Sequence, residues 1–270
     1  MSHLANPIGI ELSQLPIIKV SSSKNYRIKI CVNFGDNNNY IDWITDDFLI
    51  AKINQFMLLK RDPHIIYGYF QKSNHNNDYS IVLYCNQQVN PNNILRVYDE
   101  IQKDEDLKVF GYFTENNKEI IYFSKEKYLQ YIYYDFIWNV TPNSFIQVNP
   151  DAGTFIHTTV KRLFNQDYYY CGLGGEIGVY AKALQKKEFT CLTNSKDIYD
   201  DCILNHRKST GFYLVDYTTV DLETYMNKKN MSLIINISRN GLRNLAKQIT
   251  KIKFKQIIYI GCCDQTIYRD

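Results

Sequence analysis

From residue 142 onward, short apolar runs alternate with stretches of helical spacing, and this alternation is the strongest constraint on the fold. Strand character is expected at 168–170, 188–192, 212–215, 231–236 and 256–260. Helical spacing is expected at 150–164, after the glycines at 172–178, at 196–206 and at 240–250. Strands that alternate with helices predict a parallel sheet covered on both faces. We therefore expect an α/β domain over residues 141–270.

A glycine-rich segment, Cys171-Gly-Leu-Gly-Gly-Glu-Ile-Gly178, follows the first of these strands. Glycines at this point let the backbone approach a nucleotide-like ligand closely, near the positive end of the next helix. Gly172, Gly174, Gly175 and Gly178 are the candidate positions. The bare motif is also compatible with an ordinary tight turn in an α/β crossover.

A nucleotide-type cofactor usually needs an acidic residue after the second strand, where it binds the ribose hydroxyls. Here the strand 188–192 is followed by Thr193, Asn194 and Ser195. Asn194 could still form a hydrogen bond, but it lacks the charge that makes such a bond strong. This residue weakens the cofactor interpretation.

The preceding residues, 21–140, follow a different pattern. Polar and apolar positions alternate over 26–34, which predicts a half-buried antiparallel strand. Helices near 47–61 and 92–103 and strands at 80–85, 107–114 and 119–123 complete a compact α+β domain with an antiparallel sheet. Residues 1–20 are expected to form an N-terminal extension, because Pro7 and Pro16 interrupt regular structure.

Composition sets broad limits on function. The net charge of +3 and the pI near 8.3 permit contact with nucleic acid without arguing for it. Seven cysteines form no CxxC pair and no zinc-like spacing with histidine, so no metal site is expected. We see no secretory signal and no apolar segment long enough to span a membrane. A reducing compartment, the cytoplasm or the mitochondrion, is expected.

Three further segments carry candidate chemistry. Residues 143–149 supply amide side chains, although they could simply cap the following helix. Residues 235–242 contain Arg239 and could equally be a strand-to-helix turn. Cys262 and Cys263 follow the last strand, where a thiolate could attack an electrophilic carbon if a cation lowered its pKa. A cysteine at a strand end is otherwise often a small buried apolar residue.

Together these segments resemble the RNA uracil-C5 methyltransferases, most closely the bacterial-type branch that makes 5-methyluridine in the T-loop of tRNA. Order and spacing agree over about residues 20–270. The stretches that resemble family motifs are Asn25-Tyr-Arg-Ile-Lys29, Phe145-Ile-Gln-Val-Asn149, Tyr170-Cys-Gly-Leu-Gly174, Asn236-Ile-Ser-Arg-Asn-Gly-Leu242 and Tyr259-Ile-Gly-Cys-Cys-Asp-Gln-Thr266.

The resemblance implies an RNA-binding-like α+β domain followed by a Rossmann-like domain that binds S-adenosylmethionine against the glycine loop. It also implies that Cys262 holds the position of a nucleophile that adds to C6 of a flipped uracil. A carboxylate base would then remove the proton at C5. The implied cofactor positions are Gln147, Tyr170, Gly172, Gly174, Gly175, Asn194 and Asn236.

Several of these positions depart from the family pattern. Asn194 and Asn236 stand where the family has carboxylates, and Ile237 and Ser238 replace two prolines. Gly175 replaces the asparagine usual in the tRNA branch, and Cys263-Asp264 replaces Asn-Pro. The family's base and its last strands lie beyond the cysteine strand, where this sequence ends. We therefore expect a catalytically inactive homologue with vestigial sites that binds no cofactor.

The expected role is a structural or accessory subunit of a larger protein assembly, with a mitochondrial complex as one candidate host. One alternative is an active methyltransferase that uses S-adenosylmethionine and Cys262, with Asp264 or Asp270 as base. Another is a tRNA-binding or chaperone module. That module would present a basic face around Arg27, Lys29, Lys60 and Arg61.

Overall fold

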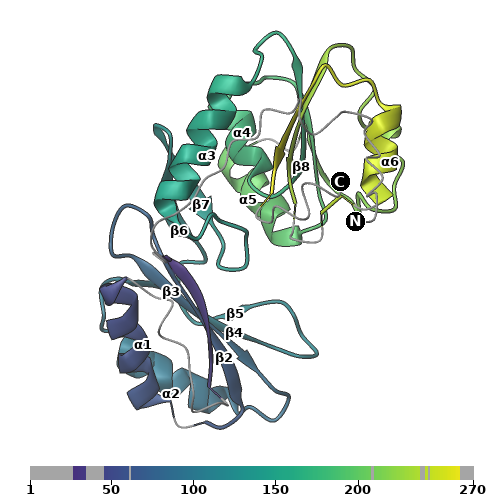
Figure 1. Cartoon of the computed structure of the whole chain (residues 1–270). Coiled ribbons are helices and arrows are strands. Elements are labelled where there is room, and N and C mark those ends of the chain that lie inside the picture. Colours follow the sequence, from purple (N-terminus) through teal and green to yellow (C-terminus); the bar gives the residue numbers. More distant parts are fainter. Residues whose placement is uncertain are drawn as a thin grey trace, which may run out of the picture. The chain divides into compact units, whose positions relative to one another are not determined.

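The computed structural model describes residues 27–34, 46–60, 62–207, 210–237, 241–242 and 244–261. They form two compact units (Figure 1). The first contains residues 27–143 and 147–154, and the second contains residues 144–146 and 155–261. The expected extension at 1–20 lies outside the described residues.

The first unit is built on a five-stranded sheet in the order β1-β2-β3-β4-β5. Neighbouring strands are antiparallel except β3 and β4, which are parallel. The sheet expected to be antiparallel is therefore mixed, because the helix expected near 92–103 is the crossover that a parallel pair requires. The bounds are β1 Lys29–Asn33, β2 Ile65–Lys72, β3 Tyr79–Cys85, α2 Pro91–Ile101, β4 Leu107–Thr114 and β5 Ile121–Tyr122.

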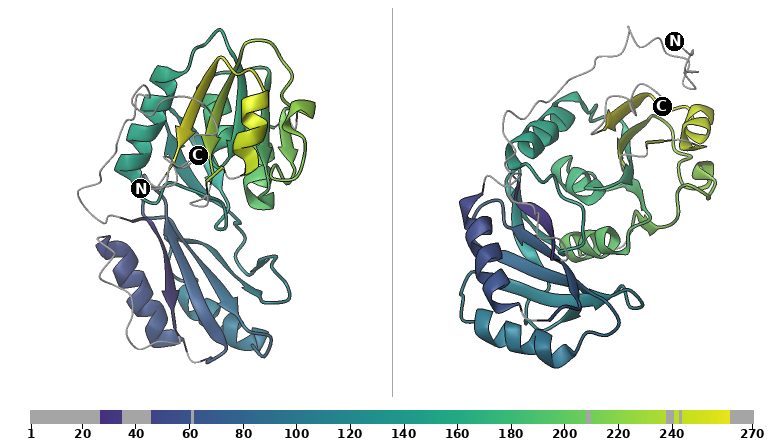
Figure 2. Two further views of the ribbon diagram at one scale, coloured as in Figure 1. Left: turned by 45° about the vertical axis from the view of Figure 1, so that its right-hand side comes forward. Right: turned by 60° about the horizontal axis from the view of Figure 1, so that its bottom comes forward.

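Helices α1 (Asp47–Leu59) and α2 lie along one face of this sheet (Figure 2). Leu49, Ile53 and Phe56 of α1 recur at helical spacing and are buried in the core between helix and sheet. The side chain of Asp46 begins the helix by accepting a hydrogen bond from the backbone of Leu49 at 3.1 Å. The apolar stripe of α1 therefore fixes which face of the helix packs on the sheet.

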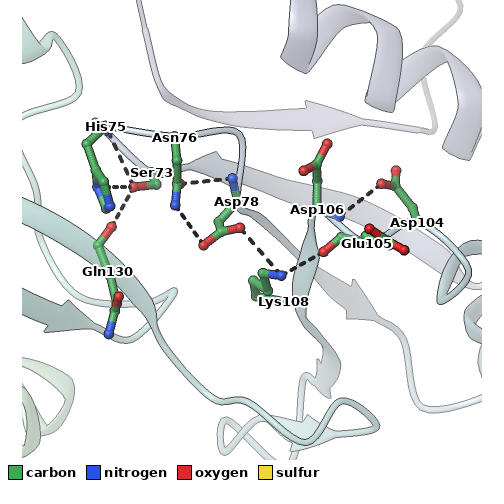
Figure 3. A network of polar contacts seen from close by, with 9 residues as sticks. All are labelled: Ser73, His75, Asn76, Asp78, Asp104, Glu105, Asp106, Lys108 and Gln130. Atoms are coloured by element: carbon green, nitrogen blue, oxygen red, sulfur yellow. Dashed lines mark hydrogen bonds and ion pairs between the residues drawn. The ribbon is translucent and has the colours of Figure 1, made fainter.

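A hairpin of β6 (Leu129–Tyr133) and β7 (Phe136–Val140) forms a separate two-stranded sheet that was not expected from the sequence. The hydroxyl of Ser73, just after β2, donates to the carbonyl of Gln130 at 2.5 Å (Figure 3). The hydroxyl of Tyr131 donates to the carbonyl of Lys72 at 2.6 Å. These bonds tie the hairpin to the end of β2.

The second unit contains a five-stranded sheet in which every neighbouring pair is parallel, as predicted. Its order is β10-β9-β8-β11-β12. Helix α6 lies on the opposite side of the sheet from α3, α4 and α5 (Figure 1). The bounds are α3 Pro150–Leu163, β8 Tyr169–Gly174, α4 Ile177–Ala183, β9 Phe189–Thr193, α5 Lys196–His206, β10 Phe212–Leu214, the 3₁₀ turn η3 Leu222–Thr224, β11 Met231–Asn236, α6 Asn244–Lys251 and β12 Gln256–Ile260.

This strand order has a topological consequence. From β8 the chain runs outward through β9 and β10, then returns to the other side of β8 as β11 and β12. The order therefore reverses between β8 and β11. Open α/β sheets bind ligands at the carboxyl ends of the strands at such a switch point. Among the described helices, none is both long enough and apolar enough to cross a bilayer.

His206, at the end of α5, is enclosed by aromatic rings of the second unit. Its Nε2 donates to the carbonyl of Gly178 at 2.9 Å, and its ring centroid lies 4.8 Å from that of Phe212 and 5.8 Å from that of Phe189. Burial lowers the pKa of His206, although the bond to Gly178 opposes this shift. The folded chain therefore favours the neutral imidazole.

A buried neutral histidine predicts a stability loss in acid. The unfolded chain takes up a proton at this histidine below about pH 6.5, while the folded chain resists it. The free energy of unfolding should therefore decrease as the pH falls from 7 to 5. Urea titrations of the wild type and of His206→Gln at both pH values test this. The variant should lose less stability between them, and an unchanged pH dependence would show that His206 is not responsible.

Candidate functional site

The carboxyl ends of β8 and β11 meet through their backbones. Gly174 ends β8 with a φ of 97°, and a β-carbon there would lie 2.1 Å from the carbonyl oxygen of Asn236. The backbone nitrogen of Gly175 donates to the same oxygen at 2.6 Å. Positive φ and this close approach together require glycine at position 174. In this structure the predicted glycine loop is the junction of the two central strands.

Gly172 makes room for the side chain of Tyr170. A β-carbon at position 172 would lie 2.5 Å from the tyrosine oxygen and 3.0 Å from the sulfur of Cys191. The Tyr170 hydroxyl is fully buried and donates to the carbonyl of Ile177 at 2.9 Å, where α4 begins. Burial raises the pKa of Tyr170 well above its usual value. Its side chain thus anchors α4 from within the core, and its part in binding a cofactor stays a prediction.

Phe145 lies over the outer side of the glycine loop. A β-carbon at Gly175 would lie 2.8 Å from the Phe145 ring, although Phe145 itself is 46% exposed. Any ligand approaching the backbone of Gly175 from this side would meet that ring. The aromatic residue at the start of the Phe-x-Gln-x-Asn segment is therefore part of the loop's surroundings.

Glu176 follows the glycines and carries the most unusual geometry of the site. It adopts a left-handed conformation, with φ 55° and ψ 13°. Its carboxylate Oε2 lies 3.1 Å from Nδ2 of Asn236 and 3.2 Å from Nε2 of His157 on α3. The side chains of Glu176 and His157 are only 1% and 5% exposed. We call these three residues the Glu176 cluster.

An amide at position 236 suits the Glu176 cluster. A buried carboxylate needs hydrogen-bond donors, and the amide nitrogen of Asn236 supplies one. An aspartate there could not donate while ionised. A non-glycine residue in the left-handed region is strained by about 1–3 kcal/mol, so the surrounding contacts must hold Glu176 in place.

Sequence reasoning missed Glu176 and His157. The available signal was local: Glu176 is the only charged residue in the otherwise uncharged stretch 173–181. His157 gave no such signal, because its partner becomes apparent only when α3 packs beside α4. That packing is visible in the edge-to-face contact of His157 with Tyr180, whose ring centroids are 5.5 Å apart.

The remaining predicted residues do not join the cluster. Asn194 is exposed after β9, and the next residue, Ser195, caps α5 by accepting a hydrogen bond from Ile198 at 3.4 Å. Gln147 is partly buried and belongs to the first unit. Cys262 lies outside the described residues. The register pairs Ile260 with Asn236, so the strand that leads to Cys262 ends beside β11.

The other described cysteines of the second unit are unsuited to nucleophilic chemistry. Burial raises the pKa of Cys171 to about 12 and also raises the pKa values of Cys191 and Cys202. A thiol that stays protonated near neutral pH is a poor nucleophile. Where the chain is described, no group of three or more His, Cys, Asp or Glu side chains could hold a metal ion.

Placing at position 236 the carboxylate that the family resemblance implies there should destabilise this chain. Asn236→Asp places a second carboxylate beside buried Glu176 and removes its amide donor, at an expected cost of roughly 2–4 kcal/mol. Chemical denaturation of the two single variants and of Glu176→Gln/Asn236→Asp measures the coupling.

The double variant exchanges the amide and the carboxylate, so it should recover most of the stability lost in Asn236→Asp. If the two single effects simply add in the double variant, the two side chains are not coupled.

No protein-family model matches the chain. It is 25% identical over 166 residues to the 23S rRNA (uracil(747)-C(5))-methyltransferase RlmC of Xenorhabdus bovienii, a match that covers 58% of this chain and 43% of that protein. It is 27% identical over 149 residues to the 23S rRNA (uracil(1939)-C(5))-methyltransferase RlmD of Legionella pneumophila, covering 51% and 33%. The matches thus span less than half the length of these relatives.

One solved structure shares the fold over most of the chain. The Pyrococcus abyssi tRNA (uracil-54, C5)-methyltransferase in complex with S-adenosyl-L-homocysteine matches with a TM-score of 0.62 and 13% identity, over 91% of this chain and 68% of that chain. The predicted fold class, an α+β unit followed by a Rossmann-like unit, is thereby confirmed. The sequence relatives act on rRNA and the structural one on tRNA, so the expected tRNA branch stays a prediction.

Proposed function

We propose, from the premise that this chain is a distant homologue of the RNA uracil-C5 methyltransferases, that it is a non-catalytic relative serving as an accessory subunit of a larger assembly. The Glu176 cluster carries the proposal. Its buried carboxylate stands at position 176, whereas the family resemblance implies carboxylates at positions 194 and 236.

The chain has neutral amides at both positions where carboxylates are expected, Asn194 and Asn236. The nearby carboxylate of Glu176 is 1% exposed and faces Asn236 and His157. Turning it toward a ligand would break its hydrogen bond to Asn236 and leave a buried polar group unpaired, which typically costs about 1–3 kcal/mol. We therefore expect low affinity for a cofactor whose ribose hydroxyls and cationic groups need carboxylate partners.

The accessory role is supported by apolar side chains at one edge of the described sheet. Tyr213 and Leu214 on the edge strand β10 are each 41% exposed. An edge strand with exposed apolar residues favours pairing with another chain. The host assembly and its mitochondrial compartment are also part of the proposal, and they rest on sequence reasoning alone.

Calorimetric titration with S-adenosylhomocysteine tests the proposal directly. We expect no saturable binding up to a ligand concentration on the order of 1 mM, where even weak sites are detectable. A catalytically active RNA uracil-C5 methyltransferase, titrated in parallel, serves as the positive control. A dissociation constant in the micromolar range would refute the non-catalytic reading of the site.

An active methyltransferase is the second candidate, because the register brings the end of β12, and hence the approach to Cys262, beside Asn236. Such an enzyme should form a covalent complex with 5-fluorouridine-substituted RNA in the presence of S-adenosylmethionine. Our proposal predicts no complex on a denaturing gel. A complex that Cys262→Ala abolishes and the matched control Cys263→Ala retains would establish the second candidate instead.

A further inference from the structure

The second unit has a strongly basic edge at the amino ends of its strands. Residues 225–230 lead into β11 and contain Lys228 and Lys229, while residues 251–255 lead into β12 and contain Lys251, Lys253 and Lys255. All five lysines are exposed, and neither segment contains an aspartate or glutamate. We call these five residues the lysine edge.

The segments of the lysine edge are held together by hydrogen bonds. The backbone nitrogen of Lys255 donates to the carbonyl of Met231 at 2.8 Å. The side chain of Gln256 accepts from the hydroxyl of Ser232 at 2.9 Å and donates to the carbonyl of Leu163, at the end of α3, at 2.7 Å. Lys161 and Arg162 are exposed on that last turn of α3. The sheet therefore gathers positive charge from three segments of the chain.

This edge lies opposite the candidate site. In a parallel sheet all amino ends share one edge and all carboxyl ends share the other. The carboxyl edge carries the acidic residues Glu176 and Asp216, after β8 and β10 respectively. The five lysines thus lie at the opposite edge of the sheet from the Glu176 cluster, and the same amino edge also carries the exposed acidic residues Asp167 and Glu188, before β8 and β9.

The lysines of the basic face expected in the first unit are less exposed than those of the lysine edge. The ammonium group of Lys29 donates to the carbonyl of Pro142 at 2.6 Å. That of Lys60 lies 4.6 Å from the centroid of the Phe34 ring, and burial lowers the pKa of Lys60. Arg61 is outside the described residues. Lys29 and Lys60 are engaged within their own unit, whereas the lysine edge is exposed.

We propose that the lysine edge binds the phosphate backbone of RNA, at a site separate from the carboxyl edge of the sheet. Exposed ammonium groups act as point charges toward phosphates, and a polyanion gains affinity by releasing counterions when several are neutralised together. The choice of RNA among polyanions rests on the family relationship in the proposed function. The binding itself needs neither cofactor nor nucleophile.

Fluorescence anisotropy with a labelled tRNA transcript and the full chain tests this inference. Two double variants, Lys228→Glu/Lys229→Glu and Lys253→Glu/Lys255→Glu, should each weaken RNA binding at least about 10-fold at 0.1 M salt. A plot of the logarithm of the binding constant against the logarithm of the salt concentration should also become less steep, by about 0.9 for each phosphate contact that is lost. Lys103→Glu/Lys118→Glu, two exposed lysines of the first unit, changes the net charge equally and should alter affinity less than about 2-fold. Unchanged melting temperatures confirm that the variants fold.

Equal losses in the control pair would overturn the inference, as would a wild-type chain that does not bind the transcript at 50 mM salt. Poly-L-glutamate that competes as well as RNA at equal charge would also overturn it, and would indicate an acidic protein surface as the partner. Failure of the RNA experiment leaves the cofactor titration unaffected. Binding of S-adenosylhomocysteine would refute the proposed function without changing the result at the lysine edge.

Discussion

The backbones of β8 and β11 touch at Gly174, where a β-carbon would fall 2.1 Å from the carbonyl oxygen of Asn236. This junction joins the two halves of the parallel sheet at the point where its strand order reverses. It also sets the start of α4, which turns Glu176 into a left-handed conformation and carries its carboxylate into the interior. The composition of the Glu176 cluster follows, because a carboxylate placed there needs a donor at position 236.

Packing accounts for two of the loop glycines in this chain. Gly172 and Gly174 are required by packing, since one accommodates Tyr170 and the other the β11 backbone. Neither glycine therefore depends on a cofactor to be retained. The charged groups follow a different pattern, with a buried carboxylate at the carboxyl edge and exposed lysines at the amino edge. A scaffold can keep its strands and turns while its function moves to another surface.

The parallel unit could be predicted closely, because its strands are mostly apolar runs separated by stretches of helical spacing. The expected bounds of β11, β12 and α5 match the structure at both ends. The first unit was harder. Its parallel β3–β4 pair follows from which strands become neighbours, and the β6–β7 hairpin lies in a tyrosine-rich stretch without strong turn signals. The Glu176 cluster could not be predicted, because it joins residues 19 and 60 positions apart.

This chain holds a carboxylate at position 176, turned inward, and an amide at position 236. Titrating S-adenosylhomocysteine into Glu176→Gln/Asn236→Asp beside the wild type measures this most directly, because the variant exchanges the two groups and changes little else. We expect the exchanged variant to bind with measurable affinity and the wild type not to bind. Micromolar binding by the wild type, equal to or tighter than that of the variant, would contradict it.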